Sequence, residues 1–169
     1  YFYQKSDAIY QLTVEFCRRF LPAYGDRTVD QMVQAARSGK QNIVEGKEAA
    51  RTSYETLLKL LNVARASLQE LLVDYEDYLR VRNFRQWELG SNEFVKAQQL
   101  GKEHNESAFW REIIKTRNGE TIANLAIILL NQCDYLLYRY ILKISERFIA
   151  EGGFREKLNQ EPRTHRYKK

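Results

Sequence analysis

The sequence predicts an all-α protein, an antiparallel up-down four-helix bundle with a long insert between its third and fourth helices. Only two prolines and eight glycines interrupt the 169 residues, so the elements are expected to be few and long. Apolar residues recur at steps of three and four over long stretches, which is the period of helices that pack along one face. Capping patterns precede two of these stretches. A chain of 20.0 kDa can bury a sizeable single core. We expect residues 1–153 to form this domain and residues 154–169 to form a basic, flexible tail.

The first helix is expected over residues 3–21 and is ended by Pro22 and Gly25. Its apolar positions are Ile9, Leu12, Phe16 and Phe20. Thr28 and Gln31 then match a capping box that would begin the second helix. The apolar side of the second helix holds Val29, Met32, Val33, Ala36 and Ile43. Gly46 is expected to be the left-handed residue just past its end.

A second capping box, Thr52 with Glu55, predicts the start of a third helix of about 30 residues. Its apolar positions alternate between steps of three and four, which is a seam for packing against other helices. They are Tyr54, Leu57, Leu61, Ala64, Leu68, Leu71, Tyr75 and Tyr78. On another side, Glu70, Asp74 and Asp77 are interpreted as a solvated or salt-bridged face.

Residues 83–119 interrupt the pattern and are expected to form a long connection on the bundle, with a short helix at about 92–100 after Ser91. Aromatic residues are expected to anchor it: Phe84, Trp87, Phe94, Phe109 and Trp110. The last helix is expected over residues 120–150, ending at Gly152-Gly153. It carries two apolar seams, which indicates that it is covered on two sides. One seam is Ala123, Ala126, Leu130, Cys133, Leu137, Tyr140 and Ile144, and the other is Ile122, Leu125, Leu129 and Leu136.

Three polar or small residues interrupt the second helix, and each has a packing explanation. Gly39 costs about 1 kcal/mol relative to Ala in mid-helix, which a close helix–helix crossing would offset. Asn42 lies one turn after Ser38 and can form a hydrogen bond there. Glu45 lies near a helix C-terminus, where a negative charge is unfavourable. A partner for it is expected among Arg37, Lys40, Lys47 and Arg51.

The net charge of +5 and the pI near 9.2 are compatible with a nucleic-acid or acidic partner. The candidate nucleic-acid-binding residues lie at the junction of the second and third helices and near the end of the last helix. They are Arg37, Lys40, Lys47, Arg51, Arg65, Arg139, Lys143 and Arg147. Tyr138 and Tyr140 add aromatic rings on which bases can stack. The alternative is an ordinary mixed helix surface.

The sequence offers no recognisable catalytic or metal site. The two histidines, His104 and His165, lack the Glu three residues earlier that di-iron bundles use. The sequence contains neither of the glycine-rich motifs that bind phosphate groups, GxxxxGK[ST] and GxGxxG. Cys17 and Cys133 are isolated among apolar neighbours, which indicates free core thiols and a reducing, cytoplasmic compartment. The apolar run at 125–130 is too short to span a bilayer. We therefore expect no enzyme activity, no cofactor, no metal and no membrane partner.

A set of motifs resembles one known family. The motifs are Ser38…Asn42-Ile43-Val44-Glu45-Gly46, then Arg51…Ser53, then Ala64-Arg65-Ala66-Ser67…Glu70-Leu71. They resemble the bacterial four-helix-bundle family first noticed as proteins encoded in intervening sequences of large-subunit ribosomal RNA genes. The family pattern has Ala at the position of Val44 and Gly at the position of Ala66. The match covers about residues 35–72, and the long insert indicates a subgroup with an extended C-terminal part.

The resemblance implies an antiparallel four-helix bundle that assembles with itself, as relatives do in pentameric barrels. One relative is the accessory protein of diversity-generating retroelements, which binds a reverse transcriptase and nucleic acid through a basic surface. The structural-motif residues are then expected to be Gly39, Asn42, Glu45, Gly46, Thr52, Ser53, Glu55, Ser67 and Glu70. The leading hypothesis is a non-enzymatic, self-assembling bundle that binds RNA or DNA. The alternatives are a protein-interaction module without a nucleic-acid role and an undetected hydrolase or metal enzyme.

Overall fold

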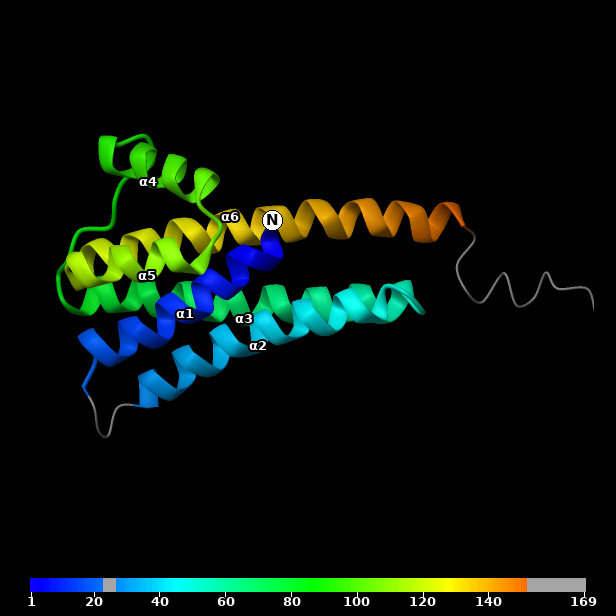
Figure 1. Ribbon diagram of the computed structural model, residues 1–169, viewed down its shortest axis with the longest axis horizontal. Coiled ribbons are helices and arrows are strands. Elements are labelled where there is room, and N and C mark those ends of the chain that lie inside the picture. The colour runs from blue at the N-terminus through cyan, green and yellow to red at the C-terminus, as the bar shows by residue number, and fades with distance from the viewer. Residues whose placement is uncertain (23–26, 152–169) are drawn as a thin grey trace, which may run out of the picture.

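The computed structural model describes residues 1–22 and 27–151, and these residues form six α-helices and no strand. The helices are α1 (Phe2–Phe20), α2 (Arg27–Ala49), α3 (Tyr54–Val81), α4 (Asn92–Glu103), α5 (Ser107–Thr116) and α6 (Gly119–Ala150). The all-α prediction is confirmed. Four long helices, α1, α2, α3 and α6, lie side by side and run in alternating directions, and we call them the helical body (Figure 1). α5 packs on α1, and α4 packs on α6.

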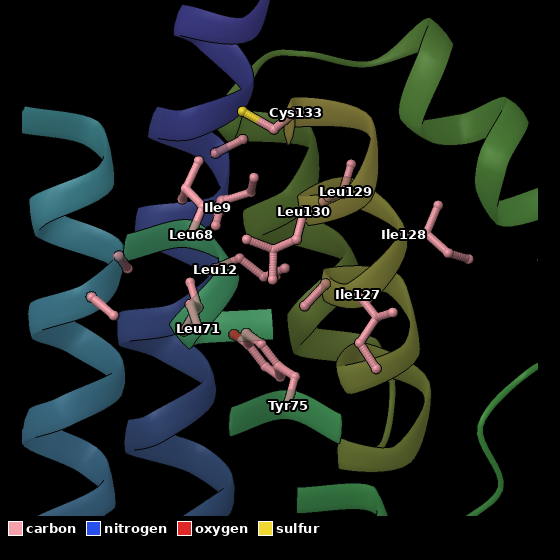
Figure 2. Close-up of a cluster of buried hydrophobic side chains, with 14 of the residues drawn as sticks. Ile9, Leu12, Leu68, Leu71, Tyr75, Ile127, Ile128, Leu129, Leu130 and Cys133 are labelled. Carbon is pink, nitrogen blue, oxygen red and sulfur yellow. The ribbon is translucent and has the colours of Figure 1, made fainter. Parts of the chain in front are cut away.

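One hydrophobic core joins the long helices. α1 contributes Ile9 and Leu12, and the predicted seam of α3 is buried from Leu57 to Tyr78. The rings of Phe16 and Tyr75 lie 4.9 Å apart between α1 and α3. Burial of these side chains supplies most of the stability of helices whose own propensity is only moderate. Figure 2 shows this cluster between α1, α3 and α6.

Two of the predicted helix starts differ from the structure. The N-cap of α3 is Ser53, whose Oγ accepts a hydrogen bond from the Thr56 backbone N–H at 3.1 Å, and not Thr52. Thr52 instead donates its hydroxyl to the Ala49 carbonyl at the end of α2, so Glu55 lies in the first turn without a capping-box partner. α2 already begins at Arg27, which places Thr28 inside the first turn and not at the cap.

Gly46 is not a left-handed helix end. α2 continues to Ala49, and Gly46 is a buried residue inside it. A Cβ built on Gly46 would lie 3.4 Å from both Leu57 Cδ1 and Leu61 Cδ2, so the glycine faces α3 at ordinary packing distance. The helix therefore runs through the glycine because packing against α3 holds it there.

Residues 83–119 are more regular than expected. Ser91 caps α4, as its position before the predicted short helix suggested, by accepting from the Phe94 N–H. A second helix, α5, follows where the sequence predicted irregular chain. Trp110 is fully buried and donates from Nε1 to the His104 carbonyl at 3.0 Å. The remaining aromatic anchors are partly buried against the core, except Phe84, which is exposed but lies 6.0 Å from the Tyr78 ring.

α6 is buried on all sides between Ile122 and Leu130. Leu130 points into the helical body, whereas Ile128 points to the other side of α6, toward α4 (Figure 2). α6 is therefore covered on two sides, and α4 supplies one of the covers. Its N-terminus is capped by Asn118, which accepts from the Thr121 N–H at 2.9 Å. Gly25, the expected stop at Gly152-Gly153 and the basic tail at 154–169 lie outside the described residues.

A buried lysine joins α4 to the helical body. Lys5 of α1 donates from Nζ to the Gly101 carbonyl in the last turn of α4, where carbonyl groups lack intrahelical partners. Gln132 of α6 donates to the Gln98 carbonyl at 2.8 Å beside it. Burial lowers the pKa of Lys5. Among the described helices, α6 is also long and apolar enough to cross a membrane by length and composition, although half of its most apolar window is buried inside the protein.

Candidate nucleic-acid interface

Positive charge gathers at one end of the helical body. The turn between α2 and α3 and the C-terminal half of α6 lie at the same end (Figure 1). We call residues 40–65 and 135–151 the basic end, and they contain eight basic and five acidic residues. Two of the eight, Lys40 and Arg65, form ion pairs with Asp7 and Asp134, which lie outside these ranges. In the rest of the described chain, 13 basic residues are balanced by 14 acidic ones. Two chain segments far apart in sequence thus contribute to one positively charged region.

The cations of α2 and of the turn that follows it differ in whether their side chains have partners. Lys40 forms a 2.6 Å ion pair with Asp7 of α1 and lies 4.9 Å from the Tyr10 ring centroid. Lys47 lies 5.1 Å from the ring centroid of Tyr3. Arg51, with 79% of its side chain exposed, makes a loose 3.9 Å contact with Glu48. Lys40 therefore joins α1 to α2, whereas Lys47 and Arg51 remain available to a ligand.

Arg37 lies on α2 one turn before Lys40, outside the basic end. It lines an open groove of about 940 Å³ between α2 and α3. The other charged residues of this groove are Arg27, Asp30, Glu70 and Asp74. Burial, with Asp77 and Glu70 nearby, raises the pKa of Asp74. A groove with both signs of charge does not favour a polyanion, so Arg37 is the weakest of the candidates.

Arg65 is a link between two helices. Its Nε and Nη2 donate to the two carboxylate oxygens of Asp134 on α6 at 2.7 and 3.0 Å, and its guanidinium lies 5.2 Å from the Tyr138 ring centroid. The hydrogen bonds with Asp134 raise the pKa of Arg65. A guanidinium and its bidentate carboxylate partner together carry almost no net charge, so they attract a phosphate only weakly. We therefore assign Arg65 to the α3–α6 contact.

The C-terminal half of α6 presents cations and aromatic rings together. Arg139, Lys143 and Arg147 are exposed. Arg139 donates from Nη1 to the Tyr135 hydroxyl at 3.0 Å. Tyr140, which the sequence placed both in this set and on an apolar seam of the last helix, is turned toward the core as the seam predicted, with its ring 5.2 Å from that of Phe2. Tyr135 replaces it as an exposed ring, and its position four residues before Arg139 was the available signal.

The polar residues of α2 that the sequence singled out form the contact with α3. Asn42 donates to the Ser38 carbonyl at 2.9 Å, and the Ser38 and Ser67 hydroxyls lie 2.9 Å apart across the two helices. Gly39 lies in the same contact, and a Cβ there would be 2.6 Å from Leu68 Cδ2. Glu45 accepts from Gln41 at 3.1 Å and not from a basic residue as expected. Of the other motif positions, Glu70 is exposed.

The arrangement can attract an anion, but the described residues contain no cluster of three or more His, Cys, Asp or Glu side chains able to hold a metal ion. Cys17 and Cys133 are buried thiols, and burial raises the pKa of Cys133 to about 12. Comparison of the chain with models of protein families, with characterised proteins and with solved structures gives no match. Function is therefore inferred from the surface itself.

Proposed function

We propose that this protein is a non-enzymatic four-helix bundle of the up-down type, with α4 and α5 as its insert, that binds nucleic acid through the basic end. The observation that carries the proposal is that the α2–α3 turn and the C-terminal half of α6 lie at one end of the helical body. These segments hold the exposed cations Lys47 and Arg51, and Lys143 and Arg147. Cations that neutralise phosphates release condensed counterions, and this release drives binding independently of sequence. The family resemblance of residues 35–72 supports the same function and adds self-assembly, to a pentamer, and a nucleic-acid enzyme such as a reverse transcriptase as a partner.

The test is fluorescence anisotropy of labelled RNA and DNA oligonucleotides at several salt concentrations. Wild-type protein is expected to bind at about 50 mM salt and to lose affinity steeply as salt rises. Reversal of the four cations to Glu should weaken binding at least about tenfold. The matched control reverses four exposed cations outside the basic end, Lys96, Lys102, Arg111 and Arg117, with the same change in net charge. Absence of binding at low salt, or equal losses in both variants, would refute the proposal.

Arg65→Met separates structural from binding roles. It removes the Asp134 link while the fold retains its core, so we expect it to lower thermal stability and leave affinity close to that of wild type. A large loss of affinity without a loss of stability would show that Arg65 binds nucleic acid directly.

The second candidate function is protein interaction, including self-association. Four apolar or aromatic side chains are exposed along the same half of α6, namely Tyr135, Tyr138, Leu142 and Ile149. Light scattering coupled to size exclusion tests self-assembly, and a monomer at all concentrations would refute it. A partner protein retained after nuclease treatment would favour the interaction module over nucleic-acid binding.

A further inference from the structure

Two tyrosine rings on α6 are exposed beside cations. Tyr135 is 56% exposed and Tyr138 is 45% exposed, although large aromatic side chains contribute most when buried. The Arg139 guanidinium lies 5.9 Å from the Tyr135 ring centroid, and that of Arg65 lies 5.2 Å from the Tyr138 centroid. Both rings therefore lie beside a guanidinium, that of Arg65 already paired with Asp134, while part of each ring remains open to solvent.

The cations continue from these rings along the helix. Tyr135, Arg139, Lys143 and Arg147 follow one another at intervals of four residues, which is about 6 Å of helix rise per step. Each step also turns the row by about 40°, so the row winds slowly around the exposed side of α6. Neither Lys143 nor Arg147 is ion-paired with another described residue. An extended polyanion can thus meet one cation after another along the row.

We propose that this face of α6 binds single-stranded nucleic acid in preference to duplex. In the bound state, bases stack on Tyr135 and Tyr138 while the backbone phosphates lie along Arg139, Lys143 and Arg147. A duplex can use the cations, but its bases are already stacked in the helix and cannot reach the tyrosine rings. The proposal rests on the proposed function and adds the strandedness of the ligand and the residues that select it.

The test compares affinities for one labelled oligonucleotide, alone and annealed to its complement, under identical salt. Wild-type protein should bind the single strand more tightly. Tyr135→Ala with Tyr138→Ala should weaken single-strand binding by about tenfold or more and leave duplex binding unchanged, because stacking is lost and charge is kept. Tyr135→Phe with Tyr138→Phe should retain single-strand binding, since the rings remain.

The outcomes are distinguishable. Equal or tighter binding of duplex, or an alanine variant that binds the single strand as wild type does, overturns the preference and leaves the proposed function intact. Absence of binding to either form overturns both. If the alanine variant changes the oligomeric state in light scattering but not the single-strand affinity, the face is a contact between subunits and the inference is wrong. Because Tyr138 contacts Arg65, the single variant Tyr135→Ala is measured alongside as a change confined to the surface.

Discussion

The two glycines of α2 provide a matched pair for testing the packing of α2 on α3. Gly39 and Gly46 are both helical and both buried in the same helix. In either position, replacement of Gly by Ala in a helix is worth up to about 1 kcal/mol of stability when the methyl group has room. The pair therefore differs mainly in what the new methyl group meets.

At Gly39 the methyl group has no room. Its Cβ would lie 2.6 Å from Cδ2 and 2.8 Å from Cγ of Leu68, and Leu68 is only 1% exposed. Relief requires movement of the branch point of a buried side chain, not only of its tip. Overpacking of this kind costs about 1–3 kcal/mol. After subtraction of the gain in helix propensity, we expect Gly39→Ala to destabilise the protein by up to about 2 kcal/mol, or up to about 8 °C in Tm.

Gly46→Ala is expected to have the opposite sign. Its Cβ would meet Leu57 and Leu61 at 3.4 Å, which is ordinary contact, so stability should rise by about 0.5–1 kcal/mol. If Gly46 were instead the left-handed end of the helix, the same substitution would be destabilising. Urea and thermal denaturation followed by circular dichroism measure both values.

A double-mutant cycle tests whether the clash with Leu68 causes the destabilisation by Gly39→Ala. Leu68→Ala alone should cost about 2–5 kcal/mol, but in that background Gly39→Ala should become neutral or stabilising because its clash is gone. Equal stabilisation by Gly39→Ala and Gly46→Ala in the wild-type background, or a cycle with no coupling, would refute the close crossing of α2 and α3.

Two further predictions concern the cap of α3 and a buried thiol. Ser53→Ala should destabilise the protein by about 1 kcal/mol because the Thr56 N–H loses its acceptor, whereas Thr52→Ala should change stability by less than about 0.5 kcal/mol; the reverse order in urea denaturation would restore Thr52 as the cap. Cys133 has its pKa raised from 9.0 to about 12 by burial, so the unfolded chain releases this proton at lower pH than the folded protein does. Relative to Cys133→Ala, wild type should therefore lose up to about 1.4 kcal/mol of stability per pH unit above about pH 9; parallel stability profiles for the two proteins would contradict this.

The surface proposals depend on features that the sequence revealed only in part. The sequence identified the cations of residues 40–65 and those of residues 135–151 as two separate clusters, because charged residues can be read directly from the chain. It could not show that Arg65 is occupied by Asp134, because that partner is 69 residues away along the chain. It placed Tyr140 both on an apolar seam and among the aromatic rings of the basic cluster, and the contact with Phe2 of α1 decides for the seam. Whether a surface side chain is free or paired therefore depends on residues of other helices.

The sequence by itself determined the all-α class, the extent of α1, α3 and α6 to within a few residues, and the buried seam of α3. These properties follow from local periodicity and from the scarcity of Pro and Gly, which act within a few turns of chain. The tertiary structure decided that α2 runs through Gly46, that α5 forms at all, and that the α2–α3 turn lies at the same end as the C-terminal half of α6. In each of these cases the deciding contact is with another helix, such as that of Gly46 with Leu57 or of Trp110 with the core, and no local pattern records such contacts.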